Sequence, residues 1–211
     1  MLSTARHRFT LTQLVLCLFI VVFGPAPAAV ASEITAPVEE LHAGLMQVIK
    51  AGRAASFRQR YDKLAPVIAG TFDLPAILRQ VTGVRWTSLP PDQRSALEDA
   101  FRRYTIASYV AAFDDFSDQL FEILPGVSAV GNDRIVQTRI TAPSGQAHTL
   151  AYVLRLTGGG WRIVDVLAEG SISRVAAQRS EVRSVLSDGG GAALLVSLRR
   201  KTAELSGDIL Q

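Results

Sequence analysis

Histidine and cysteine, the side chains that most often bind metals or act as nucleophiles, are rare among the 211 residues of this chain. The histidines are His7, His42 and His148, and the one cysteine is Cys17. A zinc site needs several such ligands close together, and isolated imidazoles do not supply one. We therefore expect no metal and no cofactor, and we interpret His42 and His148 as ordinary surface or strand-edge histidines.

Carboxylates gather at two places where they could do chemistry. Asp114, Asp115 and Asp118 could bind calcium weakly, but they lack the alternating oxygen ligands and the closing Glu of a calcium loop. A solvated helix end is the preferred interpretation. Asp165 and Glu169 could act as an acid pair, although acids at this spacing near a strand end usually cap turns and bind backbone amides.

Known catalytic motifs are missing. The glycine triplets at residues 158–160 and 189–191 lack the Gly-Lys-Ser/Thr ending of a phosphate loop, and we interpret them as a turn and a helix stop. The chain also lacks the Gly-x-Ser-x-Gly elbow of many hydrolases. These absences favour a protein that is not an enzyme.

The first 31 residues are typical of an export signal. Arg6 and Arg8 precede the apolar run Leu11–Phe23, which is too short to span a membrane, and Ala29-Val30-Ala31 resembles a cleavage site. We expect residues 1–31 to be removed, and Cys17 with them. The remainder has 20 basic against 19 acidic residues, so a role in binding nucleic acid has no electrostatic motive. We expect a single exported domain, residues 32–211.

Apolar spacing predicts three short amphipathic helices before residue 84. Thr35 is the expected N-cap of the first, which ends before Gly52. The second carries apolar residues from 57 to 68, and Pro66 is expected to kink or stop it. The third begins at Asp73 and ends before Gly83.

A longer helix is expected from about residue 88 to about residue 116. One apolar and aromatic stripe follows it, made of Leu97, Phe101, Tyr104, Ser108 and Ala112 and widened by Tyr109, Phe113 and Phe116. A helix of that length can form a wall of the domain.

Four short apolar runs then predict an antiparallel meander, with turns at Pro125-Gly126, residues 143–145 and residues 158–160. In the third run Leu150, Tyr152 and Leu154 share one face, and the other face is also mostly apolar, which favours a sheet covered on both sides. Two helices follow, the first capped by Ser171 or Ser173 and ended by residues 189–191. Helices, then a sheet, then helices indicate an α+β fold.

Two stretches of the chain carry motifs of a known family. The first is Ser88–Arg94 followed by Phe101-Arg102-Arg103-Tyr104 and Tyr109, which is similar to a Thr/Ser-Pro-x-Gln-Arg and Phe-x-x-Tyr-x-x-x-x-Tyr helix. The second is Trp161–Ser173 with Gln178–Glu181, which is similar to a Trp-x-x-x-Asp-x-x-x-Glu-Gly-x-Ser segment and the helix after it. Both motifs resemble those of the MlaC-type family of periplasmic lipid carriers. Within the family, the second stretch looks closest to the HpnM-like branch associated with hopanoid biosynthesis.

The resemblance implies helices wrapped around a curved antiparallel sheet of about four strands, with an apolar cavity for acyl chains. It also implies a periplasmic carrier, expected to be a monomer, that moves a phospholipid or a hopanoid-type lipid between the inner and outer membranes. The implied partners are an inner-membrane lipid transporter and an outer-membrane lipoprotein complex. The residues expected to bind lipid are Phe101, Tyr104, Ser108, Tyr109, Ala112, Phe113, Tyr152, Leu154 and Ile163.

Two other classes of function stay open. An envelope isomerase or hydrolase could use Asp165 or Glu169 with a tyrosine in a pocket of the same fold. An envelope adaptor without a ligand could use its apolar C-terminal helix and the basic residues Arg199-Arg200-Lys201 to bind a partner.

Overall fold

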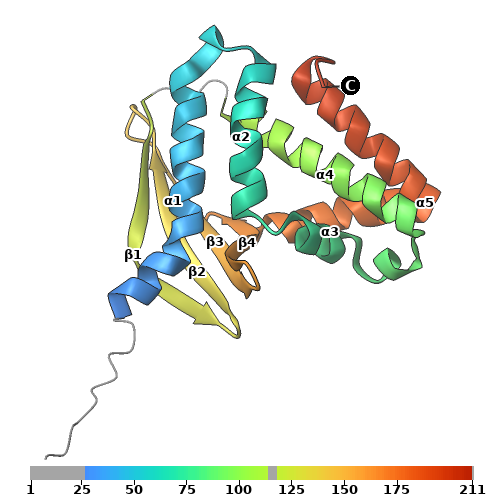
Figure 1. Ribbon diagram of the computed structural model, residues 1–211. Coiled ribbons are helices and arrows are strands. Elements are labelled where there is room, and N and C mark those ends of the chain that lie inside the picture. Colours follow the sequence, from blue (N-terminus) through green and yellow to red (C-terminus); the bar gives the residue numbers. More distant parts are fainter. Residues whose placement is uncertain (1–26, 114–117, 211) are drawn as a thin grey trace, which may run out of the picture.

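Five antiparallel strands follow one another both along the chain and across one sheet, in the order β1-β2-β3-β4-β5. The computed structural model describes residues 27–113 and 118–210. The strands are β1 (Leu120–Val130), β2 (Asp133–Thr141), β3 (Ala147–Thr157), β4 (Gly160–Ala168) and the short β5 (Ile172–Ser173). Figure 1 shows them as one curled sheet on one side of the molecule. Bulges interrupt the pairing of β1 with β2 and of β3 with β4, and bulges bend a sheet.

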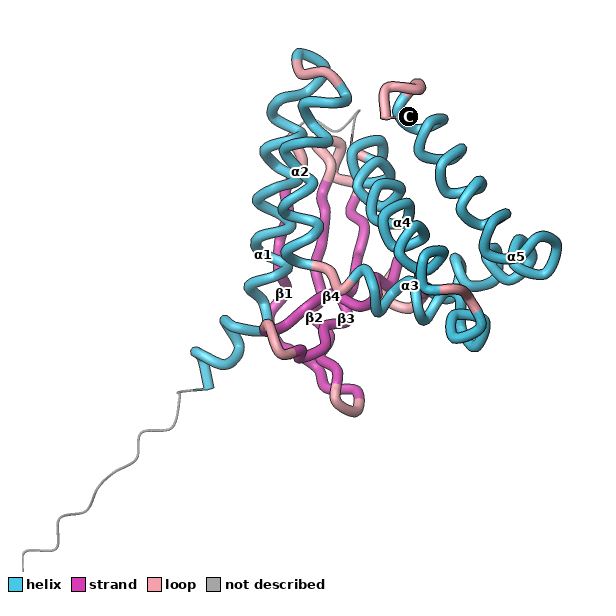
Figure 2. Tube along the Cα trace, turned by 45° about the vertical axis from the view of Figure 1, so that its right-hand side comes forward, coloured by secondary structure: helices cyan, strands magenta, loops and turns pink. Residues whose placement is uncertain are grey.

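Helices cover this sheet and extend beyond its edge (Figures 1 and 2). They are α1 (Pro27–Ala51), α2 (Phe57–Thr71), α3 (Leu74–Thr82), α4 (Pro91–Ala112) and α5 (Arg174–Ser206), with short 3-10 helices at Gly52–Ala54 and Gly83–Ser88. α1 and α2 pack side by side, and α4 packs between α2 and α5. The α+β class expected from the sequence is confirmed.

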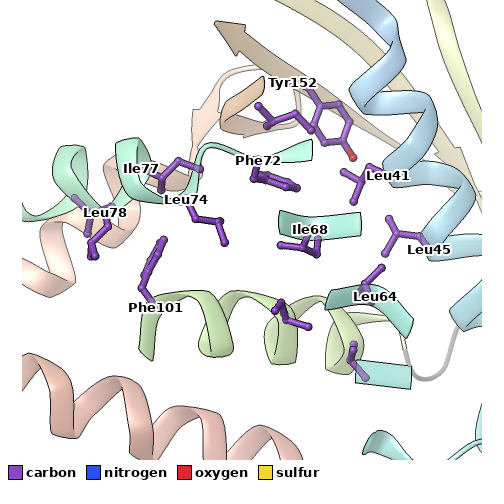
Figure 3. Close-up of a cluster of buried hydrophobic side chains, with 14 of the residues drawn as sticks. Leu41, Leu45, Leu64, Ile68, Phe72, Leu74, Ile77, Leu78, Phe101 and Tyr152 are labelled. Atoms are coloured by element: carbon purple, nitrogen blue, oxygen red, sulfur yellow. The ribbon is translucent and has the colours of Figure 1, made fainter. Parts of the chain in front are cut away.

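The core lies where α1 and α2 meet the sheet. Leu41 and Leu45 of α1, spaced one helical turn apart, are fully buried against Leu64 and Ile68 of α2 (Figure 3). Tyr152 of β3 closes this cluster from the sheet side with 1% of its surface exposed. Each aliphatic side chain buried in this way contributes roughly 1.5–3 kcal/mol to folding, so this cluster fixes the helices on the sheet.

The first two helices are longer than the sequence predicts. α1 begins at Pro27, so Thr35 lies inside it and does not cap it; the Thr35 hydroxyl donates instead to the Ser32 carbonyl within the helix. α2 continues past Pro66 to Thr71. A proline costs a helix one hydrogen bond, but Ile68 beyond it is fully buried, and that packing holds the last turn in place.

The boundaries of the other helices agree better with the sequence prediction. Asp73 caps α3 by accepting a hydrogen bond from the Ala76 amide, and Gly83 ends that helix as predicted. Ser173, the second of the two predicted caps, begins α5. α4 starts at Pro91 and ends at Ala112, about one turn short of the prediction at each end. A separate 3-10 helix occupies residues 83–88, and the chain leaves the helix at Phe113.

The predicted turn at Pro125-Gly126 is wrong. These residues lie inside β1, where the pairing with β2 shifts between Ile123 and Val127. A proline without an amide hydrogen and a glycine with φ of 90° fit a bulge on an edge strand, so they bend the strand without ending it.

Some sequence predictions lie outside the described residues. They concern His7, Cys17 and most of the export signal, and also Asp114, Asp115 and Phe116. Among the helices that are described, none is long and apolar enough to cross a membrane.

Candidate functional site

A pocket of about 260 Å³ opens between α4, the ends of β3 and β4, α3 and the first turns of α5. Its walls are mostly aromatic and aliphatic. The residues that line it are Phe72, Leu74, Ile77, Phe101, Tyr104, Thr105, Ser108, Tyr109, Ala112, Phe113, Leu150, Tyr152, Asp165, Val166, Ala168, Arg174, Val175 and Gln178.

α4 supplies one whole wall of this pocket because its contributing residues recur every three or four positions. Ser108 and Ala112 are small, and their size leaves room where a leucine would fill it. The Ser108 hydroxyl donates to the Tyr104 carbonyl one turn earlier at 2.8 Å, and Thr105 does the same to Phe101. Both hydroxyls are therefore satisfied within the helix, so this wall makes few polar demands on a ligand.

Aromatic rings run from the pocket towards the core. The rings of Phe72 and Tyr109 lie 5.6 Å apart, Tyr109 stacks on Phe113 at 6.4 Å, and Phe113 meets Phe121 of β1 at 6.0 Å. Burial raises the pKa of the Tyr109 phenol, and the same holds for Tyr152. Both phenols are neutral at physiological pH, so these rings present an uncharged surface.

The polar groups of the pocket lie where α5 begins. Asp165 of β4 accepts hydrogen bonds from the amides of Val166 and Val175 at 2.8 and 3.1 Å and from the Ser173 hydroxyl at 2.5 Å. These bonds tie the first turn of α5 to the sheet and occupy the carboxylate. Arg174 is exposed beside them, so it is the cation of the pocket rim.

Seven of the nine residues expected to bind lipid line the pocket, namely Phe101, Tyr104, Ser108, Tyr109, Ala112, Phe113 and Tyr152. Leu154 and Ile163 do not line it, and both are fully buried. They face each other in the β3–β4 ladder, and the loop before α3 pairs with β4 at Ile163. Phe72 forms a bridge with Ile163, whose carbonyl accepts a hydrogen bond from the Asp73 amide at 3.0 Å.

Several lining residues were not singled out from the sequence. Two of them follow from periodicity, since Thr105 lies one turn after Phe101 and Leu150 lies two residues before Tyr152 on the same strand face. Phe72, Leu74, Val175 and Gln178 come from segments that only the tertiary structure brings to the pocket.

His42 is not a surface residue as the sequence suggested. It is 7% exposed, its ring lies 5.0 Å from Phe121 and 5.9 Å from Tyr152, and its buried Nε2 has no hydrogen-bond partner. Desolvation lowers the pKa of His42 to about 4, so the ring is neutral at physiological pH. It acts as part of the aromatic core.

The remaining candidates for acid-base or metal chemistry lie outside the pocket. His148 Nδ1 and Glu169 Oε1 are 3.3 Å apart, and both side chains are more than half exposed. Within residues 27–113 and 118–210, no three His, Cys, Asp or Glu side chains gather as a metal site would require.

The sequence model of the MlaC protein family matches residues 39–200 of the chain. A curated relative, Toluene tolerance protein ttg2D of Pseudomonas putida, is 22% identical over 111 residues. That match covers 52% of this chain, and the chain spans about half the length of the relative. Among solved structures, a phospholipid-binding protein from Ralstonia solanacearum in complex with a phospholipid has a TM-score of 0.71. It is 20% identical, with 82% of this chain and 98% of that chain covered, so the two share a fold.

Proposed function

We propose that this chain, which belongs to the MlaC protein family, binds the acyl part of a membrane lipid in the pocket beside α4 and carries it through the periplasm. The observation that carries the proposal is the wall of α4. There small residues hold open a space among aromatic rings, and the nearby hydroxyls bond to their own helix. Such a wall suits hydrocarbon better than a polar metabolite.

Transfer energies explain why a lipid needs a carrier. Each methylene group that leaves water gains roughly 0.8 kcal/mol, so two acyl chains with about 30 methylenes resist entry into water by on the order of 20 kcal/mol. An apolar pocket makes the exchange from membrane to protein nearly balanced. The carrier itself then needs no chemical step, and direction comes from the proteins it meets at each membrane.

The enzyme alternative is the weaker one. Asp165, its first candidate acid, has its carboxylate engaged in three hydrogen bonds that hold α5, and Glu169 is exposed outside the pocket. Binding without turnover fits these placements better. The adaptor alternative is also weaker, because an adaptor has no need of an open pocket inside the domain.

The lipid is proposed to be a phospholipid, with a hopanoid-type polycyclic lipid as the alternative. The complexed phospholipid of the Ralstonia solanacearum protein, which shares this fold, supports the first choice. We further propose that the chain acts after removal of residues 1–31, that it works as a monomer, and that it exchanges lipid with an inner-membrane transporter and an outer-membrane lipoprotein complex.

Lipid transfer between two vesicle populations tests the carrier proposal. Donor vesicles contain a fluorescent phospholipid together with a quencher, acceptor vesicles contain neither, and the chain beginning at Ser32 is added in catalytic amount. We expect fluorescence to rise in proportion to protein concentration. A rate equal to that of vesicles alone, with phospholipid and with hopanoid probes alike, would rule out a carrier.

A further inference from the structure

A second cavity lies next to the main pocket, between α3, α4 and α5. It is small, with a volume of about 30 Å³, and more enclosed than the main pocket. Apolar side chains form most of its walls. They include Leu78 and Val81 of α3, Phe101 of α4, and Leu194 and Leu198 of α5.

The two cavities share a partition. Phe101, Tyr104 and Gln178 line both of them. Phe101 is buried, whereas Tyr104 and Gln178 are only half-buried. An acyl chain that fills the main pocket therefore meets these three side chains, and a further, mostly apolar space lies on their other side.

The far wall of the second cavity is a separate arm of α5. Gly190 has φ of 66° and ψ of −158°, which interrupts the helix and divides α5 into residues 174–189 and 191–206. The second arm turns back beside α4 and ends at the C-terminus (Figures 1 and 2).

Side-chain contacts hold the two arms together at the partition. Lys201 of the second arm forms an ion pair with Glu181 of the first, and its Nζ lies 5.8 Å from the centre of the Tyr104 ring. The Glu181 side chain is 56% exposed, and exposed ion pairs contribute little to stability. The ion pair therefore adds little to the apolar packing that holds the second arm, whose Leu194 and Leu198 are buried.

A two-chain lipid needs more room than the main pocket offers. Pockets that enclose drug-sized ligands measure roughly 300–1,000 Å³, and a two-chain lipid is larger than such ligands. At about 260 Å³ the main pocket holds only part of a lipid.

We propose that the second cavity is the inner end of the lipid site, and that it receives the distal methylenes of a long acyl chain. The acyl chain displaces the side chains of the partition, Phe101, Tyr104 and Gln178, and the second arm of α5 moves outward about Gly190. The ligand class is thus a lipid with at least one long, linear acyl chain. This inference rests on the proposed function and deepens it.

The test measures affinity against chain length. Single-chain lysophospholipids of increasing length are titrated into the delipidated chain below their micelle-forming concentrations. Each methylene that leaves water for protein raises affinity roughly fourfold. The ratio of long-chain to short-chain affinity therefore reports how much of the acyl chain the protein encloses. Ser197→Phe fills the second cavity, and we expect it to lower that ratio roughly tenfold while short-chain affinity stays unchanged.

Two further variants make the result decisive. Val196→Phe places the same ring on the neighbouring residue, which is 65% exposed, and should keep the wild-type ratio. Tyr104→Ala opens the partition and should raise the ratio, which keeps the test valid if Ser197→Phe does not fold. An unchanged ratio in Tyr104→Ala, or in folded Ser197→Phe, would overturn the inner site while leaving lipid binding intact. Failure of the wild-type chain to bind any length would instead overturn the proposed function.

Discussion

Ser108 and Ser187 make the same bond in two different settings. Each hydroxyl donates to the carbonyl one turn earlier, to Tyr104 at 2.8 Å and to Arg183 at 2.9 Å, but Ser108 lines the pocket and Ser187 is exposed on α5. Side-chain size at these two positions therefore separates an effect on the pocket from an effect on helix stability.

Ser108→Trp is expected to abolish lipid binding without unfolding the protein. The indole has an open space of about 260 Å³ to enter, so it occupies the volume that a ligand would take. We expect at least a tenfold loss in affinity for a fluorescent phospholipid, measured by titration, and a thermal midpoint close to that of the wild type. Ser187→Trp is the matched control and should bind normally. Equal affinities in both variants would place the lipid elsewhere.

Burial of His42 makes the stability of the fold depend on pH. Its pKa is about 4 in the folded chain against 6.5 in the unfolded chain, so between these values the unfolded state binds more protons. The contribution of His42 to the free energy of unfolding is therefore present in full above pH 6.5 and is lost as pH falls towards 4. At 1.36 kcal/mol per pKa unit, the loss is about 3 kcal/mol.

His42→Leu removes this proton uptake from a site whose neighbours are Phe121 and Tyr152. Urea unfolding at pH 7 and pH 4 should show that the wild type loses about 3 kcal/mol more than the variant does. The variant should be at least as stable as the wild type at pH 7, because the buried Nε2 has no partner to lose. Parallel losses in both proteins would show that His42 titrates normally and is not buried as described.

At the scale of elements, the junction of β4 with α5 depends on Asp165. Asp165→Asn replaces one acceptor oxygen by a donor amide, while Ser173 and the amides of Val166 and Val175 still require acceptors. We expect a loss of roughly 1–3 kcal/mol in unfolding free energy, measured in urea, with lipid binding retained. Glu169→Gln, on an exposed side chain, should change stability by less than about 0.5 kcal/mol. If the wild type turned over a lipid and a fully stable Asp165→Asn variant did not, the result would instead favour an enzyme.

The break in α5 depends on Gly190. Its φ of 66° with ψ of −158° belongs to a region that side chains with a Cβ avoid, so Gly190→Ala should cost about 1–3 kcal/mol in thermal or urea unfolding. Gly158→Ala is the control, because Gly158 has no positive φ and no atom within 4 Å of an added Cβ. If Gly190→Ala were as stable as the control, α5 would have to pass this point as a regular helix.

Local patterns predicted most elements because the apolar stripe of a helix and the apolar alternation of a strand involve residues that are close together in the sequence. The α4 stripe correctly brought Phe101, Tyr104 and Ser108 to one pocket. The pattern failed at Leu154 and Ile163, which are fully buried and do not line the pocket. Strand alternation alone cannot show which part of a face is covered by the chain itself and which part stays open.

Proline and cap signals failed for a related reason. Pro66 and Pro125 each weaken the element they occupy, but buried neighbours and a bulge respectively let the element continue. Thr35 is a good cap in isolation, yet α1 begins earlier, at Pro27. At Pro66, tertiary packing outweighs a local cost of about 3 kcal/mol. Residues 30–33 of α1 are exposed, so packing does not explain the early start of that helix.

In the whole molecule, two bodies of packing lie around one pocket. α1 and α2 close the core against the sheet, whereas α4 and α5 extend past the sheet and leave the pocket between them and its end (Figure 1). The first body supplies stability. The second supplies the pocket, to which α5 contributes Arg174, Val175 and Gln178, all from the arm before Gly190.

Lipid content is the decisive measurement, made on the chain beginning at Ser32 and purified from the periplasm without detergent. Solvent extraction followed by mass spectrometry should recover about one membrane lipid per protein molecule, and much less from Ser108→Trp prepared in parallel. Protein that carries no lipid, or equal lipid in the wild type and Ser108→Trp, would contradict the claim that the pocket beside α4 encloses acyl chains.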